Sequence, residues 1–232
     1  MNRATDQIRA VFFDRDGTLC YRSPERDHEF QQWVRERSRF QTIPFTQSQA
    51  TVWQEFFVSH RSDMVTDVFS EAQFWIEFWQ RSLDLLGVDP VYLDEALDKF
   101  VFFKFSEIYA ETRPVLTALF ERGYLLGVIS DTFPSLGDSL SHLRLDHFFS
   151  TVIDSTSVGV MKPAPQIYER ALWALDVLAA QSLFVDDVYE HVKGAREVGM
   201  QGLWLNRTQA EHNLDEGIVA DLQGVLLYLG IS

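Results

Sequence analysis

The sequence has a single cysteine, no long apolar run and few basic residues. A single cysteine, Cys20, cannot form an intrachain disulfide, which is consistent with the reducing environment of the cytoplasm. We expect Cys20 to be a small packed residue rather than a nucleophile. No apolar run is long enough to cross a bilayer, and the N-terminus leads into a short strand-like segment rather than a signal peptide, so we expect a cytoplasmic protein. The 20 Lys and Arg residues are outnumbered by 34 Asp and Glu, which gives a net charge of −14. This charge opposes phosphate backbones and anionic lipid surfaces, so we expect neither nucleic acid nor membrane as a partner.

The C-terminal half alternates short apolar runs with helix-like stretches. Five apolar runs, one near the N-terminus and four in this half, have the composition of strands buried on both faces: Ala10–Phe13, Leu125–Ile129, Thr151–Ile153, Leu183–Val185 and Gly202–Leu205. The stretches between the last four carry apolar residues at three- and four-residue spacing. This alternation predicts a mostly parallel sheet covered by helices, an α/β fold.

Residues 21–108 have a different pattern, with helical segments and no convincing strand. Ser70 and Gln73 resemble a capping box that opens one helix, and Gly87 closes it. Asp89 and Pro90 are typical of the cap and first residue of another helix, which we expect to run to about Phe103. We therefore expect a helical domain at 21–108, inserted into an α/β domain made of 1–20 and 109–232.

Polar residues follow four of the expected strands where each ends. They are Asp14 and Asp16 after the first strand, Ser130 after the second, Lys162 in the loop after the third, and Asp186 and Asp187 after the fourth. The carboxyl ends of parallel strands meet at one edge of the sheet, where catalytic groups gather. The spacing thus predicts one site that contains all of these side chains.

Four segments in this order carry a family resemblance: "DRDGTL", "VISDT", "GVMKPAPQIYERA" and "FVDDVYEHVKGA". Together they resemble the haloacid dehalogenase-like hydrolase superfamily. The insert is similar to that family's helical cap of the first type in position, size and character. The resemblance implies a Rossmann-like, doubly wound parallel sheet with an inserted α-helical cap domain.

The first motif has the residue types that phosphoryl transfer needs. A carboxylate at Asp14 can attack phosphorus and form an acyl phosphate, and the resemblance gives Asp14 this nucleophilic role. Asp16 supplies a second acid, which can protonate the leaving oxygen and later accept a proton from water. We expect Gly17 to let the chain turn sharply and Thr18 to hold that turn by a side-chain hydrogen bond.

The other motifs complete the expected substrate site. Ser130 resembles the family hydroxyl that donates a hydrogen bond to a phosphoryl oxygen. Lys162 matches the lysine that neutralises the nucleophile and the transferring group. Asp131 stands where family members commonly have Asn, beside the expected substrate, and its carboxylate would repel an anion unless it is turned away or paired.

A divalent cation would offset the charge of this acidic cluster, and Mg²⁺ prefers oxygen ligands. By resemblance the ligands are the Asp14 carboxylate, the Asp16 backbone oxygen and the Asp187 carboxylate, with Asp186 acting directly or through water. His191 stands where some relatives have a further Asp, and we expect it at the surface or outside the ligand set.

An acid at Asp16, with the Asp186–Asp187 pair, favours Mg²⁺-dependent hydrolysis of a small phosphorylated metabolite. Dehalogenases of the family attack carbon, need no metal and typically carry a non-acidic residue at that position. A phosphonatase would need a Schiff-base lysine in the cap, where only Lys99 and Lys104 occur. A dehalogenase, a phosphomutase and a noncatalytic binding protein remain the alternatives.

Substrate choice is expected to depend on the insert, where two groups of side chains are candidates. One is the helical aromatic cluster Phe74, Trp75, Phe78 and Trp79, which is more typical of a core. The other contains Arg22, Arg26 and His28, which lie soon after the first motif and could approach a second anionic group. Both a monomer and a homodimer fit the sequence.

Overall fold

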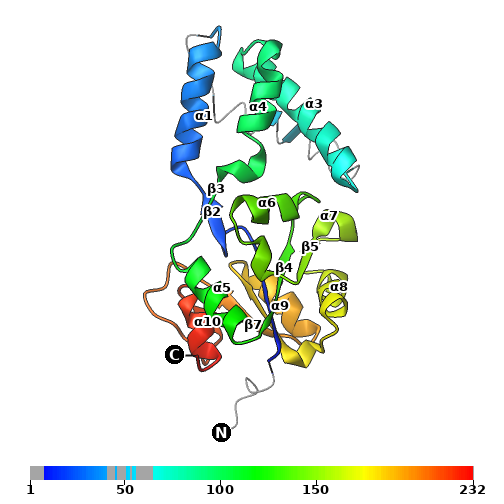
Figure 1. The fold of residues 1–232 in the computed structure, drawn as a ribbon, viewed down its shortest axis with the longest axis vertical. Helices are drawn as coiled ribbons and strands as arrows, with labels where there is room; N and C mark the ends of the chain where they lie inside the picture. Colours follow the sequence, from blue (N-terminus) through cyan, green and yellow to red (C-terminus); the bar gives the residue numbers. More distant parts are fainter. Residues whose placement is uncertain (1–7, 41–44, 46–50, 53, 56–64, 232) are drawn as a thin grey trace. The chain divides into compact units, whose positions relative to one another are not determined.

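The chain folds into two compact units (Figure 1). The computed structural model describes residues 8–40, 45, 51–52, 54–55 and 65–231. One unit consists of Met1–Tyr21 and Glu107–Ser232 and is called here the sheet unit. The other, Arg22–Ser106, is called the helical unit.

The sheet unit is built on a six-stranded parallel sheet with the order β5-β4-β1-β6-β7-β8. Its strands are β1 (Ala10–Phe13), β4 (Leu125–Ser130), β5 (Thr151–Asp154), β6 (Ser182–Asp186), β7 (Gln201–Leu205) and β8 (Ile218–Val219). The five apolar runs of the sequence form the first five of these strands, which confirms the predicted α/β class. β1 lies between β4 and β6, where the strand order changes direction, and ligands of open parallel sheets bind at such a point.

Two apolar cores cover the two faces of this sheet, because successive side chains of a strand point to opposite faces. Val11 and Phe13 of β1 belong to one core, and Ala10 and Phe12 belong to the other. Helices α5 (Thr112–Glu121), α6 (Leu136–His142) and α10 (Gln223–Tyr228) contribute to the first core, and α8 (Pro165–Leu175) and α9 (Tyr189–Glu197) to the second. The short α7 (Ser155–Val158) follows β5. The burial of β1 on both faces explains why it is an unbroken apolar run.

The helical unit contains α1 (Pro24–Arg37), α3 (Val68–Leu86), α4 (Leu93–Lys99) and two short 3₁₀ helices, Pro90–Tyr92 and Phe102–Phe105. The predicted capping box at Ser70 and Gln73 is wrong, because α3 begins three residues earlier. Asp67 is the N-cap and accepts hydrogen bonds from the backbone N–H groups of Phe69 and Ser70, while Ser70 Oγ accepts from the Asp67 N–H. Gly87 ends the helix with φ of 68°, as predicted.

The helix after Asp89 is also shorter than predicted. Asp89 caps Pro90–Tyr92, and α4 ends at Lys99 rather than near Phe103. Among the described residues, no helix has both the length and the apolar character of a membrane span.

Three short strands escaped the sequence prediction. β2 (Cys20–Arg22) and β3 (Ser106–Ile108) form a separate two-stranded sheet where the chain passes between the two units. β8 has only two residues and adds to the edge of the main sheet. Runs of two or three residues are too short to show the alternation that identifies a strand.

Candidate active site

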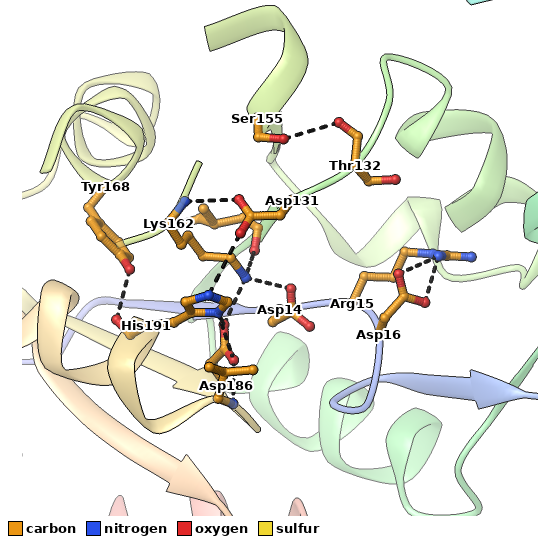
Figure 2. A network of polar contacts seen from close by, with 12 residues as sticks. Asp14, Arg15, Asp16, Asp131, Thr132, Ser155, Lys162, Tyr168, Asp186 and His191 are labelled. Atoms are coloured by element: carbon orange, nitrogen blue, oxygen red, sulfur yellow. Dashed lines mark hydrogen bonds and ion pairs between the residues drawn. The ribbon is translucent and has the colours of Figure 1, made fainter. Parts of the chain in front are cut away.

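Asp14 follows the last residue of β1, at the centre of the carboxyl edge of the sheet. Its backbone N–H donates to the Val185 carbonyl at 2.9 Å, which continues the pairing of β1 with β6. Its side chain is buried and faces Lys162 and Asp186 (Figure 2). The parallel pairing therefore holds this carboxylate between the ends of two neighbouring strands.

Lys162 is the buried cation of the site. Its Nζ donates to Asp14 Oδ1 at 2.6 Å, to Asp186 Oδ2 at 2.7 Å and to the Ile129 carbonyl at 3.2 Å. The ammonium has three protons, so these three acceptors satisfy it fully. Burial opposes its charged form, but the two carboxylates outweigh burial and hold the pKa of Lys162 above its ordinary value.

Three carboxylates meet beside this lysine: Asp14, Asp186 and Asp187 offer oxygen atoms that all lie within 4.8 Å of one another. Asp186 is fully buried, whereas Asp187 is exposed. Hard oxygen donors in such a cluster are the ligands that Mg²⁺ prefers. The ammonium of Lys162 carries a single positive charge and cannot neutralise three carboxylates, so these residues fit a divalent cation in both ligand type and charge.

The pKa values of the three carboxylates differ because burial and neighbouring charges act on each of them differently. Burial raises the pKa of Asp14 to about 7, with Lys162 opposing and the charge of Asp186 adding to the shift. Burial and the neighbouring Asp186 also raise the pKa of Asp187. Burial acts in the same direction on Asp186, but hydrogen bonds from His191 and Lys162 and the lysine charge outweigh it and lower the pKa of Asp186.

The turn after β1 places the second acid of the motif. Asp16 is exposed, and both of its carboxylate oxygens accept hydrogen bonds from Nη1 of the buried Arg15, at 2.7 and 2.8 Å. Gly17 has φ of +77°, and a Cβ atom at this position would lie only 2.2 Å from Asp187 Oδ2. The glycine is therefore required both by the turn and by the close approach of Asp187.

The expectation that the Thr18 side chain holds this turn by a hydrogen bond is wrong. Its Oγ1 is buried, and no other group in the described part of the chain accepts or donates a hydrogen bond there. The turn is held instead by Arg207, whose Nε donates to the Gly17 carbonyl at 3.1 Å and whose Nη2 donates to the Thr18 carbonyl at 2.8 Å.

The sequence analysis did not identify Arg207, whose side chain is fixed by two further contacts. Its Nη1 donates to Glu111 at 2.7 Å, and its guanidinium lies over the ring of Tyr109 at 3.3 Å. Arg207 comes just after β7, so extending the search for polar residues at strand ends to the fifth predicted strand would have found it.

The structure also places the remaining predicted residues of the sheet unit. Ser130 is the last residue of β4 and is buried. The carboxylate of Asp131 accepts a hydrogen bond from the Lys162 backbone N–H at 2.9 Å. His191 is partly buried and contacts a residue of the acidic cluster, which fits the second of the two positions expected for it: its Nδ1 lies 3.1 Å from Asp186 Oδ2. Its side chain is only 20% exposed.

The candidate residues of the helical unit already have partners within that unit. Arg22 donates through Nε to both carboxylate oxygens of Asp27, and its guanidinium lies 4.5 Å from the centre of the Phe105 ring. Arg26 pairs with Glu29 and donates to backbone carbonyls. Their predicted contact with a substrate anion stays a prediction, as does that of the exposed His28.

The aromatic cluster is buried in the helical unit, with each of Phe74, Trp75, Phe78 and Trp79 between 5 and 8% exposed. Trp75, Phe78 and Trp79 also line a cavity of about 70 Å³. Of the two lysines in the insert, Lys99 pairs with Glu95 and Lys104 with Asp98, both at the surface. The cluster is therefore mainly a core, and neither lysine is in the buried environment that favours a Schiff base.

Comparisons with known proteins show the family of this chain. A family model described as haloacid dehalogenase-like hydrolase matches residues 8–199. A glyceraldehyde 3-phosphate phosphatase from Pyrococcus abyssi is 30% identical over 202 residues, which cover 85% of this chain and 81% of that protein. Among solved structures, a 2-haloacid dehalogenase from Pseudomonas syringae is 20% identical, with a TM-score of 0.69 over 96% of this chain and 98% of that one. The HAD-hydrolase YfnB from Bacillus subtilis, solved bound to magnesium, is 15% identical, with a TM-score of 0.66 over 97% of this chain and 100% of its own. The matched residues include all four motifs of the site, and the chain belongs to the haloacid dehalogenase-like hydrolases.

Proposed function

We propose that this hydrolase is a Mg²⁺-dependent phosphatase that cleaves a small phosphate monoester through an aspartyl-phosphate on Asp14. The observation that carries the proposal is the environment of Asp14, whose carboxylate lies 2.6 Å from a buried ammonium and beside two further carboxylates. A second acid, Asp16, follows in the same turn. The likeness to a glyceraldehyde 3-phosphate phosphatase supports phosphate ester hydrolysis and makes that triose phosphate the first substrate to test.

The metal would be held by the carboxylates of Asp14 and Asp187 and by the backbone oxygen of Asp16. Asp186 already accepts hydrogen bonds from Lys162 Nζ and the Val188 N–H, so it would act directly or through water. When bound, Mg²⁺ would supply positive charge that offsets the negative charge of the phosphoryl group. YfnB, with the same fold, is solved with magnesium.

In the first step a carboxylate oxygen of Asp14 attacks the phosphorus atom, and the bond from phosphorus to the ester oxygen breaks. Asp16 donates its proton to this leaving oxygen and becomes a carboxylate. The Lys162 ammonium and the Ser130 hydroxyl stabilise the charge on the transferring group. The products are a free alcohol and a phosphoryl group bound to Asp14.

In the second step the Asp16 carboxylate accepts a proton from water, and the water oxygen attacks phosphorus. The bond between phosphorus and the Asp14 oxygen breaks, so inorganic phosphate leaves and the Asp14 carboxylate is restored. Asp16 is then protonated again and ready for the next ester. The same residue therefore serves first as an acid and then as a base.

Dehalogenation is the second reaction to test, because haloacid dehalogenases share this fold. It would use Asp14 against carbon rather than phosphorus and would need no acid at position 16. The presence of Asp16 and of the clustered carboxylates favours the phosphatase. The prediction that the helical unit sets substrate choice stays a prediction.

The experiment measures phosphate release from p-nitrophenyl phosphate, glyceraldehyde 3-phosphate and a panel of phosphorylated metabolites, and halide release from 2-haloacids. We expect phosphate release with Mg²⁺, no release in EDTA, and no release by Asp14→Asn with Mg²⁺. Asp138→Asn, at an exposed position of α6, is the matched control and should retain activity. Full activity in EDTA, or halide release without phosphate release, would overturn the proposal.

A further inference from the structure

The proposed chemistry leaves unused two partly buried titratable side chains of the sheet unit, Asp131 and His191. Asp131 directly follows β4, and His191 lies in the first turn of α9, after β6. Their side chains are only 14% and 20% exposed. The strands that precede them, β4 and β6, flank β1, and the two side chains face each other, with His191 Nε2 3.8 Å from Asp131 Oδ2.

Asp131 holds the backbone of the loop that carries Lys162. Its Oδ1 accepts a hydrogen bond from the Lys162 N–H at 2.9 Å. A hydrogen bond to an ionised acceptor is stronger than one between neutral groups. The Asp131 carboxylate, which the sequence predicts beside an anionic substrate, therefore has a hydrogen-bond partner within the protein.

His191 joins this carboxylate to Asp186. Its Nδ1 lies 3.1 Å from Asp186 Oδ2, and its Nε2 lies 3.8 Å from Asp131 Oδ2 (Figure 2). The Tyr168 hydroxyl on α8 donates to the His191 carbonyl at 2.7 Å, which ties the backbone of this residue to a second helix. The imidazole is therefore held between two carboxylates that follow different strands.

These contacts close a ring around Lys162. The backbone N–H of Lys162 binds Asp131, Asp131 faces His191, His191 contacts Asp186, and Asp186 binds Lys162 Nζ. Both ends of the lysine are thereby fixed, and its Nζ also donates to the Asp14 carboxylate. A residue held at the backbone and at the charged end has little freedom to leave the nucleophile.

We propose that Asp131 and His191 are positioning residues that act as one unit, through Asp186, to hold Lys162 against Asp14. The inference rests on the proposed function, because the role of Lys162 is to stabilise the phosphoryl group on its way to Asp14. It also gives a physical reason for the two departures from the family pattern: the Asp131 carboxylate accepts a hydrogen bond from the Lys162 backbone, and His191 contacts Asp186 on one side and faces Asp131 on the other.

The test compares kcat and KM for p-nitrophenyl phosphate with Mg²⁺ in Asp131→Ala, His191→Ala and the double variant. Loss of a group that orients a catalytic residue typically costs 10- to 100-fold, so we expect each single variant to lower kcat by about that factor while KM changes less than about threefold. Either change opens the same ring, so the double variant should be no worse than the worse single one. If the two residues acted independently, the factors by which the single variants lower kcat would instead multiply in the double variant.

Conservative variants separate positioning from simple loss of structure. Asp131→Asn keeps an oxygen acceptor for the Lys162 N–H and should recover most of the lost kcat. His191→Asn keeps a donor toward Asp186 and should lie between His191→Ala and the wild type. His147→Ala and Asp138→Ala, both at exposed positions of the same unit, are controls that should match the wild type.

A second readout is the Lys162 amide proton in ¹H–¹⁵N spectra, which does not depend on turnover. A hydrogen bond to a carboxylate moves an amide proton downfield, so the resonance should move upfield in Asp131→Ala and less in Asp131→Asn. If an alanine variant does not fold, Asp131→Ser replaces Asp131→Ala with the same expected loss of kcat, and His191→Asn replaces His191→Ala with the smaller loss expected for it.

The outcomes separate this inference from the proposed function. A wild type without phosphatase activity would refute the proposed function, whatever the amide spectra show. An active wild type with unchanged kcat in the Asp131 and His191 variants, or an additive loss in the double variant, would overturn the inference alone.

Discussion

Replacing Lys162 by methionine tests the electrostatic reading of the site most directly. Methionine keeps most of the length of the side chain but removes the ammonium, which has 1% exposure and holds Asp14 and Asp186 at 2.6 and 2.7 Å. Two buried carboxylates would then face each other without their cation. Removing one partner of a buried ion pair costs about 3–5 kcal/mol, which is a large part of the total stability of about 5–15 kcal/mol that is usual for a protein.

The loss should depend on pH, because Asp14 has a raised pKa of about 7. At pH 8 the wild-type Asp14 carboxylate is paired with Lys162, whereas in the variant Asp14 loses this partner and must keep its proton or stay charged beside Asp186. At pH 5.5 Asp14 keeps a proton in both proteins, and the cost should be lower by up to about 1.4 kcal/mol. Mg²⁺ should restore part of the stability at pH 8, since it supplies the missing positive charge.

The assay is urea unfolding of the wild type and Lys162→Met at pH 5.5 and pH 8, in EDTA and in Mg²⁺. Lys193→Met is the matched control, because the Lys193 side chain is 55% exposed and its ion pair with Glu190, at 3.7 Å, lies in solvent. Its free energy of unfolding should change by less than about 0.5 kcal/mol. A Lys162→Met protein as stable as the wild type at pH 8 in EDTA would refute the reasoning. A loss that is the same at both pH values would assign it to packing rather than to charge.

Three further predictions concern the acids and the turn that carries them. Asp16→Asn should lower kcat by about 10²–10⁴-fold. Beryllium fluoride, a phosphate analogue, should still bind this variant and raise its thermal unfolding temperature. Loss of the fold would instead assign Asp16 a purely structural role. In EDTA the free energy of unfolding should decrease as the pH rises from 4 to 7, by at most about 4 kcal/mol. The reason is that folded Asp14 keeps its proton up to about pH 7, whereas the unfolded chain releases it near pH 3.8. Stabilisation by Mg²⁺, which displaces that proton, should accordingly be larger at pH 8 than at pH 5.5 in thermal unfolding; the opposite order would contradict the raised pKa. Arg207→Met removes the donors to the Gly17 and Thr18 carbonyls and should lower kcat about 10-fold or more. Arg122→Met is the control, because Arg122 is exposed and donates to the Ala118 carbonyl of α5.

Much of the sheet unit was predictable because its signals are local. A strand buried on both faces must be apolar along its whole length, so the five runs identified β1, β4, β5, β6 and β7. The polar residues that interrupt these runs at one end then had to share an edge of the sheet. This argument placed Asp14 beside Asp186 and Asp187 without knowledge of a single contact.

Local signals failed where two good candidates compete or where the element is very short. Asp67 and Ser70 are both favourable N-caps three residues apart, and the structure uses Asp67 as the cap with Ser70 bonding back to it. β8 has two residues, and β2 and β3 have three each, which is too few for a period to appear.

The sequence by itself determined the strands, the strand ends and the residue types able to carry phosphoryl transfer, because each of these depends on neighbours along the chain. Only the tertiary structure decided which group holds each catalytic residue. Arg207 reaches the turn after Asp16 across 190 residues of sequence, and His191 comes between Asp131 and Asp186 only because β4 and β6 lie on either side of β1. Contacts of this kind depend on which strands become neighbours in the sheet, and no spacing in a single sequence records that choice.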